Sequence, residues 1–347
     1  MNTLVDDIGS LPLPHYANER LFNEAYELAR EAIINGKNVK EDKFIFNNFY
    51  RVIVDSFKKK LAAGLDVVNY PQHYDMHKQF ADAIHKAMDK GTYVVDKTQA
   101  VIPEVHVINN EARQISEEIG RKISLRICIT GPLELYLKEI GTTAYSDVLL
   151  MFAESVKNFA KNSVLNSKHV ATEVVSLDEP SFGFQDVSAE QDLVLDVLEK
   201  AFDFGGAVKQ IHLHSSTRVA DLLNVKNVDV LSFEYASSPK NIDAVSKAML
   251  ERVDKQIRVG IARTDINTML AELYEKGVAK PTLEQLVESE ENIRQRFVKA
   301  KAKYGERMSF TGPDCGLGGW STQESALLLL EKTVNAVKTT KKVQSNL

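Results

Sequence analysis

The chain has 347 residues, of which 44% are hydrophobic and 26% are charged, values typical of a soluble globular protein. This composition excludes intrinsic disorder, a collagen-like repeat and a disulfide scaffold. The 43 basic and 48 acidic residues give a net charge of −5, so the chain has no overall basic footprint for nucleic acid. A chain of this length can bury about three quarters of its unfolded surface, so it needs neither a metal nor a disulfide merely to fold.

Cysteine usage and hydrophobicity bear on cellular location. The two cysteines, Cys128 and Cys315, lie far apart in the sequence, which favours a reducing compartment. The N-terminal residues resemble no signal peptide, and the longest apolar runs, such as 148–153 and 326–330, are too short to span a bilayer. We therefore expect a cytoplasmic protein that binds neither membrane nor nucleic acid.

Short β-branched runs alternate along the chain with longer segments of helical period, a pattern that indicates βα units and a parallel sheet. The expected strands are 7–10, 65–70, 124–130, 173–178, 210–214, 229–234, 258–262 and 309–313. Helical patterns between them include 18–34, 43–63, 146–165, 189–204 and 283–304. This order predicts a (β/α)₈ TIM barrel, with a doubly wound open sheet as the alternative.

Two segments interrupt this pattern. The stretch 90–111 predicts a small hairpin inserted after the second strand, and 338–347 predicts a frayed, solvated end to the last helix. No internal repeat and no Gly/Ser/Pro-rich linker divides the chain, so we expect one barrel domain over 1–347.

Polar residues recur where the expected strands end, which is where TIM barrels carry their catalytic groups. Among them are His214, Glu234 and Cys315. Imidazole, carboxylate and thiolate are zinc ligands, and three protein ligands leave the fourth tetrahedral position open, as in catalytic zinc sites. His212 shares a strand face with His214 and is a candidate further ligand or a supporting hydrogen-bond donor. A hydrogen-bonded histidine, a solvated glutamate and a buried cysteine remain the alternative.

Two adjacent carboxylates, Asp178 and Glu179, follow the expected fourth strand. Because neighbouring residues of a strand point to opposite faces, we expect only one of them to reach the pocket. A carboxylate at this position suits the ammonium group of an amino-acid substrate. The alternative is a cap for the following helix.

The chain resembles the C-terminal catalytic domain of cobalamin-independent methionine synthases, whose superfamily includes uroporphyrinogen decarboxylase-like barrels, and it corresponds to a single-barrel member. The matching segments are Ile-Gly-Ser-Leu-Pro at 8–12, Thr-Gly-Pro at 130–132, Leu-Asp-Glu-Pro at 177–180, Ile-His-Leu-His at 211–214, Asp-Val-Leu-Ser-Phe-Glu at 229–234 and Pro-Asp-Cys-Gly at 313–316. They follow the order of the family along nearly the whole chain.

The resemblance implies a zinc-dependent transfer of a methyl group to the thiol of homocysteine, giving methionine. It implies one zinc ion per chain on His214, Glu234 and Cys315. It also implies substrate contacts from Ile8, Gly9 and Ser10, and from Asp178 to the substrate ammonium. Zinc binding converts a thiol, a poor nucleophile at neutral pH, into a thiolate.

Several family positions carry other residues. Ser216 replaces the second zinc cysteine. The site then has three protein ligands, or another residue such as His212 replaces the cysteine as ligand, or no metal binds. Asn267 replaces the histidine that donates a proton, and Lys78 corresponds to a glutamate that helps to bind homocysteine. Lys138 and Phe184 stand where the family contacts folate with a tryptophan and a glutamate.

These replacements predict that the enzyme is independent of folate. Methyl-folate needs an acid to protonate its departing nitrogen, whereas a corrinoid leaving group does not, so we expect methylcobalamin or a methylated corrinoid protein as donor. Two alternatives remain: methylation of another thiol such as coenzyme M, for which Lys78 would suit an anionic substrate, and a non-catalytic barrel that binds a small molecule or a partner. A decarboxylase has no use for the His/Glu/Cys set.

Overall fold

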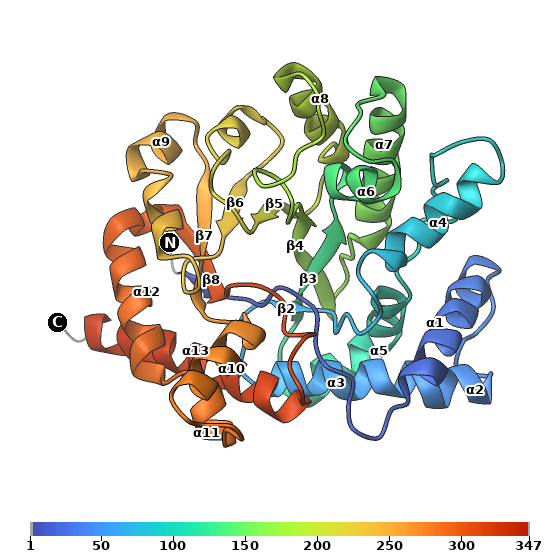
Figure 1. Cartoon of the computed structure of the whole chain (residues 1–347). Coiled ribbons are helices and arrows are strands. Elements are labelled where there is room, and N and C mark those ends of the chain that lie inside the picture. Colours follow the sequence, from blue (N-terminus) through green and yellow to red (C-terminus); the bar gives the residue numbers. More distant parts are fainter. Residues whose placement is uncertain (1–2, 346–347) are drawn as a thin grey trace.

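Parallel strands form one sheet whose order follows the chain (Figure 1). The computed structural model describes residues 3–345. Within them the sheet has eight strands in the order β1-β8-β7-β6-β5-β4-β3-β2. The strands are β1 Leu4–Val5, β2 Val68–Asn69, β3 Ile123–Thr130, β4 Val170–Asp178, β5 Val208–Leu213, β6 Val230–Phe233, β7 Gln256–Ala262 and β8 Met308–Pro313.

Helices surround these strands (Figure 1). They are α1 Glu19–Ile34, α2 Lys43–Ile45, α3 Arg51–Ala62, α4 Lys78–Met88, α5 Pro103–Ile119, α6 Pro132–Glu139, α7 Ser146–Ser163, α8 Gln191–Ala201, α9 Lys247–Arg252, α10 Ile266–Glu275, α11 Leu283–Leu286, α12 Glu290–Tyr304 and α13 Gln323–Ser345. A π-helical segment, η1 Phe46–Tyr50, joins α2 to α3, and 3₁₀ turns occupy η2 Asp221–Asn224, η3 Pro239–Asp243 and η4 Gly305–Arg307.

The sheet closes on itself between the first and second strands. Parallel bridges join Asp6 to Val67 and Ser10 to Gln72, and the backbone N–H of Val67 donates to the carbonyl of Val5 over 3.2 Å. This closure confirms the predicted TIM barrel over the open sheet. The first strand lies earlier than expected, at Leu4–Val5, because residues 7–10 form the loop that leaves it.

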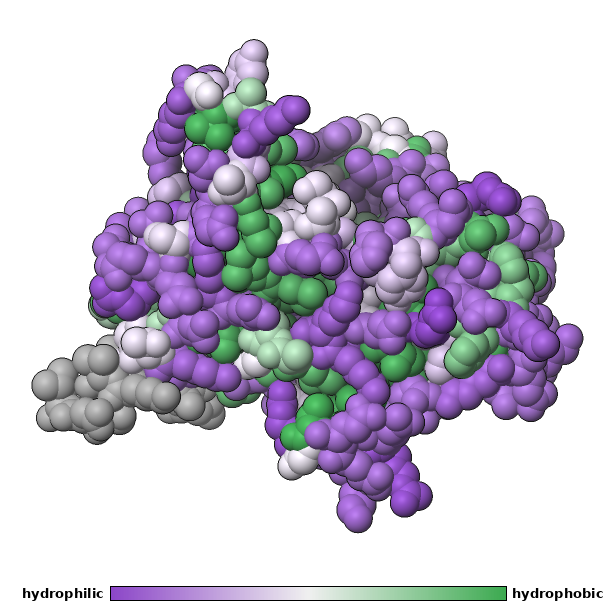
Figure 2. Space-filling model, turned by 90° about the horizontal axis from the view of Figure 1, so that it is seen from below, coloured by the Kyte–Doolittle hydropathy of each residue, from purple (hydrophilic) through white to green (hydrophobic). Residues whose placement is uncertain are grey.

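Amphipathic helices cover the barrel. Helix α1 shows the pattern: Asn18 caps its N-terminus by accepting from the backbone N–H of Leu21 over 3.1 Å, and Phe22, Tyr26 and Ala29 face the core. On the face shown in Figure 2, hydrophobic residues form separate patches between hydrophilic ones. Within residues 3–345, no helix combines the length and apolar character needed to cross a membrane.

Side chains inside the barrel lie in layers contributed by alternate strands, as is usual for this fold. One layer comes from the even strands and is apolar: Val174, Val230 and Phe310 with Val67, which precedes β2. A second layer comes from the odd strands and is polar: Asp6, Arg126, Gln210 and Arg258 are each fully buried.

The predicted hairpin within 90–111 is wrong. Residues 90–102 form turns and irregular backbone, and α5 begins at Pro103. The valines that suggest a strand find other partners, since the Val95 N–H donates to Ser155 Oγ over 2.8 Å and Asn158 donates to the Val95 carbonyl over 2.9 Å. Both side chains belong to α7 and satisfy the backbone without a second strand.

Two helical predictions also change. The pattern at 283–304 divides into α11 and α12, and Ser289 caps the second helix by accepting from the Asn292 N–H over 3.3 Å. Helix α13 continues to Ser345, through most of the segment predicted to fray, while residues 346–347 lie outside the described part of the chain.

Candidate functional site

Four potential metal ligands meet at the carboxyl end of the barrel. His212 lies on β5 and His214 directly after it, Glu234 follows β6, and Cys315 follows β8. One ligand atom from each lies within 4.8 Å of the others. Cys315 Sγ is 3.4 Å from His214 Nε2, which is 3.7 Å from a carboxylate oxygen of Glu234. Three of these residues are those predicted from the sequence, and the fourth is the predicted substitute.

The loops that carry these groups are fastened by a single amide. Asn241, in η3, donates to the backbone carbonyls of His214 and Glu234 over 3.2 and 2.8 Å, and its amide oxygen accepts from Ser216 Oγ over 2.8 Å. Ser216 is therefore engaged by Asn241. Its hydroxyl holds the loop after β5.

A buried carboxylate shapes the loop after β6. Asp314 accepts from the backbone N–H groups of Tyr235, Ala236 and Ser237 over 3.0, 2.9 and 2.6 Å. Ser237 Oγ in turn donates to Glu234 over 3.0 Å. Because Asp314 precedes Cys315, the same bonds set the position of Cys315 relative to Glu234.

The environment of the cluster disfavours charge on its own groups. Burial, followed by the negative charge of Asp314, raises the pKa of Glu234 to about 7. Burial, followed by the carboxylate of Glu234, raises the pKa of the Cys315 thiol, while burial lowers the pKa of both His212 and His214. A divalent cation reverses this preference for the thiol and the carboxylate, and neutral imidazole is the ligand form of histidine.

His212 has one satisfied and one unsatisfied ring nitrogen. Its Nδ1 lies 3.1 Å from Ser232 Oγ, on the neighbouring strand β6. Its Nε2 is buried and has no hydrogen-bond partner among the described residues. This orphaned nitrogen and the mixed N, O and S donor set fit a zinc ion.

The two adjacent carboxylates at the end of β4 have separate roles. Glu179 accepts from the backbone N–H groups of Leu133 and Glu134 over 2.9 and 2.7 Å, and so caps α6. Asp178 is buried and accepts from Ser176 Oγ over 2.8 Å. Burial raises the pKa of Asp178 to about 6. Glu179 therefore caps the preceding helix α6, not the following helix for which the sequence suggested a cap.

The loop after β1 lies against the loop that carries Cys315. The carbonyl of Ser10 accepts from the Leu317 N–H over 2.8 Å, and Ser10 Oγ accepts from the Gly318 N–H over 3.1 Å. Gly9 has a φ of +108°, and a Cβ there would overlap the Cys128 sulfur, so this turn requires glycine. The structure thus brings the predicted substrate segment, Ile8 to Ser10, beside the candidate ligands.

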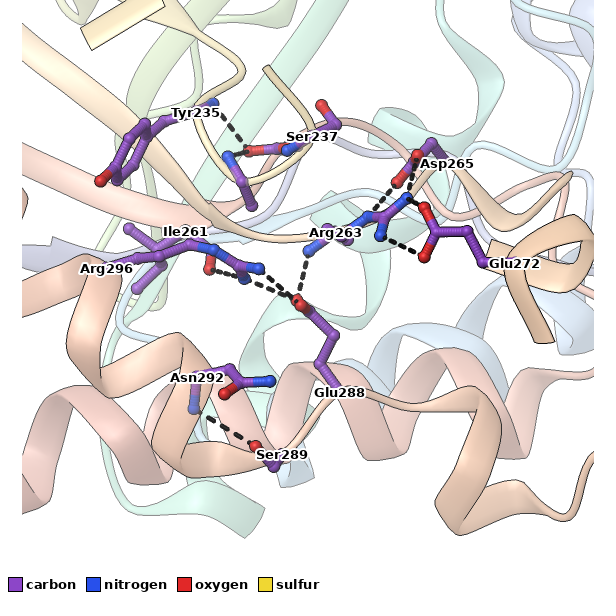
Figure 3. A network of polar contacts seen from close by, with 12 residues as sticks. Tyr235, Ser237, Ile261, Arg263, Asp265, Glu272, Glu288, Ser289, Asn292 and Arg296 are labelled. Atoms are coloured by element: carbon purple, nitrogen blue, oxygen red, sulfur yellow. Dashed lines mark hydrogen bonds and ion pairs between the residues drawn. The ribbon is translucent and has the colours of Figure 1, made fainter. Parts of the chain in front are cut away.

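Ion pairs order the segment that carries Asn267 (Figure 3). Arg263 binds Asp265 and Glu272 over 2.7 and 2.9 Å, while Glu288 accepts from the Arg263 backbone N–H and the Arg296 guanidinium, both over 2.8 Å. Asn267 itself is exposed in the first turn of α10.

Three other residues singled out from the sequence lie on the surface. Lys78 is exposed at the start of α4, where its backbone N–H donates to Asp75. Lys138 pairs with Glu134 over 3.7 Å, and the Phe184 side chain is 71% exposed.

Sequence reasoning missed Asn241, Asp314 and Ser232, which support the ligands rather than join them. Asp314 lies within the Pro-Asp-Cys-Gly segment and Ser232 within the Asp-Val-Leu-Ser-Phe-Glu segment, so both could have been noticed there, whereas Asn241 carries no local signal. Their roles depend on which loops the barrel brings together.

Comparison with known proteins finds a relative that matches most of the chain. A methionine synthase from Methanocaldococcus jannaschii is 23% identical over 291 residues, covering 80% of this chain and 85% of that protein. The predicted resemblance to methionine synthases is confirmed. No protein-family model matches the chain.

Solved structures agree with the fold. A B12-independent methionine synthase from Shewanella sp. W3-18-1, in complex with selenomethionine, superposes with a TM-score of 0.60 at 15% identity over all of both chains. A methyltransferase from Methanosarcina mazei has a TM-score of 0.56 at 12% identity, over 96% of this chain and 94% of that one. The M. jannaschii relative bears out the expectation of a methyltransferase enzyme, and the two solved structures bear out the barrel fold.

Proposed function

We propose that this chain is a zinc-dependent methyltransferase that methylates the thiol of homocysteine to form methionine. The observation that carries the proposal is the convergence of His214, Glu234 and Cys315, from three different strands, at the carboxyl end of the barrel. The named methionine synthase relative supports the reaction class. We propose further that residues 1–347 form one domain, which acts in the cytoplasm.

In this proposal the protein holds zinc through His214, Glu234 and Cys315 and binds the substrate beside it. When bound, zinc supplies the positive charge that keeps a thiol in its nucleophilic thiolate form. Asp178 takes the substrate ammonium, and the loop 8–10 contacts the amino-acid backbone. Holding the thiol in line with the methyl donor is the main contribution of the surrounding residues.

For the methyl donor we favour methylcobalamin or a methylated corrinoid protein. Asn267 is exposed and its amide has no acidic proton to give to a departing folate nitrogen. The exposed Phe184 and Lys138 provide neither of the folate contacts implied by the family resemblance. A sulfonate thiol is the second candidate acceptor, since the positive charge of Lys78 would suit an anionic substrate. The third candidate is a barrel that binds a small molecule or a partner without catalysis.

The first experiment measures zinc per chain in protein purified without chelator, beside Cys315→Ser. About one zinc per chain, lost in the variant, is expected. The second supplies homocysteine and compares methylcobalamin, a methylated corrinoid protein and methyl-folate as donors. Methionine formed from methyl-folate alone would refute the donor assignment, and absence of zinc with no turnover from any donor would favour the binding protein.

A further inference from the structure

The Ser216 hydroxyl stabilises the loop after β5 and does not serve as a ligand. It donates to the amide oxygen of Asn241, whose amide nitrogen holds the carbonyls of His214 and Glu234, so rotating the hydroxyl toward the cluster would cost its hydrogen bond to Asn241. An alcohol is also a poor zinc ligand beside imidazole, carboxylate and thiolate. Three protein ligands therefore remain unless another residue takes the fourth position.

His212 has the geometry for that position. Its ring lies 5.7 Å from the ring of His214, centroid to centroid, and residues two apart on a strand share a face. A ligand atom of His212 lies within 4.8 Å of those of His214, Glu234 and Cys315. The side chain is 1% exposed, and its Nε2 has no partner among the described residues. A buried polar nitrogen without a partner is costly, so its position beside three donors indicates a ligand that satisfies it.

The other ring nitrogen is already supported. Nδ1 lies 3.1 Å from Ser232 Oγ, a distance at which Nδ1–H can donate to the hydroxyl, which would place the lone pair on Nε2. Metal-binding histidines characteristically give their second N–H to such a partner, which fixes both the tautomer and the ring orientation.

Resting on the proposed function, we infer that His212, through Nε2, is the fourth protein ligand of the zinc site and takes the place left by Ser216. The site without substrate is then a His₂–Glu–Cys set, and the substrate thiolate would enter as a fifth ligand or replace one of the four. Two neutral imidazoles, one carboxylate and one thiolate leave the zinc site formally neutral.

The test counts imidazoles on zinc directly. Protein prepared without a polyhistidine tag is loaded with Zn²⁺ and examined by X-ray absorption, whose imidazole scattering distinguishes two histidine ligands from one. Wild type is expected to show two imidazoles and one sulfur. His212→Gln is expected to show one imidazole. In chelator competition it should bind Zn²⁺ more than about 100-fold more weakly, because loss of a residue that only supports a ligand costs about 10–100-fold and loss of a ligand itself should cost more.

Two variants serve as controls. Ser216→Ala removes the hydroxyl at the family's cysteine position, and His15→Gln removes an exposed histidine; both are expected to retain two imidazoles. The number of imidazoles on zinc in wild type is measured without any variant, so the test still holds if His212→Gln folds poorly. Circular dichroism shows whether that variant is folded. Zinc held with one imidazole in wild type would overturn the inference but leave the proposed function standing. Failure of wild type to bind Zn²⁺ would overturn both.

Discussion

The Asp6 carboxylate and the Arg258 guanidinium form an ion pair in the centre of the barrel, with 2.7 Å between Oδ1 and Nε and no exposure of either side chain. The other oxygen of Asp6 binds Arg126 over 2.8 Å. Arg258 also donates to the carbonyl of Pro313 over 2.8 Å, two residues before Cys315. One carboxylate thus ties the first, third and seventh strands together beneath the candidate site.

Replacing Asp6 should be severe. We expect Asp6→Asn to lower the free energy of unfolding by about 3–5 kcal/mol, because two buried arginines would lose the carboxylate with which they form ion pairs. Urea unfolding checks this. The matched control is Asp254→Asn, where the Asp254 side chain is 91% exposed in its pair with Arg307 and should contribute no more than about 1 kcal/mol. Equal effects of the two substitutions would contradict the central role of Asp6.

The turn before α6 should not accept a side chain. A Cβ at Gly131 would overlap the Glu179 carboxylate, which caps α6 through the Leu133 and Glu134 N–H groups. We expect Gly131→Ala to destabilise the protein by about 1–3 kcal/mol. Gly205→Ala is the control, since nothing lies within 4 Å of a Cβ there. The midpoint temperature of thermal unfolding is measured for both variants. If the midpoint of Gly131→Ala is no lower than that of Gly205→Ala, the Glu179 cap does not require glycine at position 131.

Asp178 should govern recognition of the amino group. If it binds the substrate ammonium, Asp178→Asn should weaken homocysteine binding by about 10–100-fold, the usual contribution of a hydrogen bond to a charged group. Calorimetric titration measures this change. Binding of a thiol without an amino group should be unaffected, and a comparable loss for both thiols would mean that Asp178 acts on the fold of the pocket instead.

His73 should make stability depend on pH. Its Nδ1 lies 2.7 Å from the Leu11 carbonyl and its Nε2 lies 2.9 Å from Ser56 Oγ, and burial lowers its pKa to about 4. Below its ordinary pKa of about 6.5 the unfolded chain takes up a proton that the folded protein does not. The stabilising contribution is therefore complete above pH 6.5 and falls by up to about 3 kcal/mol as the pH drops to about 4.

Urea unfolding at pH 7 and pH 5 measures this effect. His73→Asn removes the titrating ring, so its loss of stability between the two pH values should be smaller than that of wild type. His15→Asn, which removes an exposed histidine, should keep the wild-type slope. An unchanged slope in His73→Asn would show that other groups cause the acid sensitivity.

Much of the architecture follows from local patterns. The apolar runs that became β3 to β8 were recognisable because parallel strands buried on both faces are hydrophobic throughout. The polar residues at their ends, His214, Glu234 and Cys315, could be assigned to one mouth because parallel strands share a direction. The hairpin predicted within 90–111 is wrong because its β-branched residues are also compatible with irregular backbone, whose N–H and carbonyl groups bind side chains of α7.

The sequence by itself determined the barrel and three of the clustered groups, since alternation, strand ends and residue chemistry are all local properties. Only the tertiary structure decided that Ser216 binds Asn241 and that Asp6 joins two arginines across the barrel. It also placed a ring nitrogen of His212 within 4.8 Å of the Cys315 sulfur and left His212 Nε2 without a hydrogen-bond partner among the described residues. The physical reason is that these partners lie on different strands and loops. Their meeting depends on barrel closure and register, which no local pattern encodes.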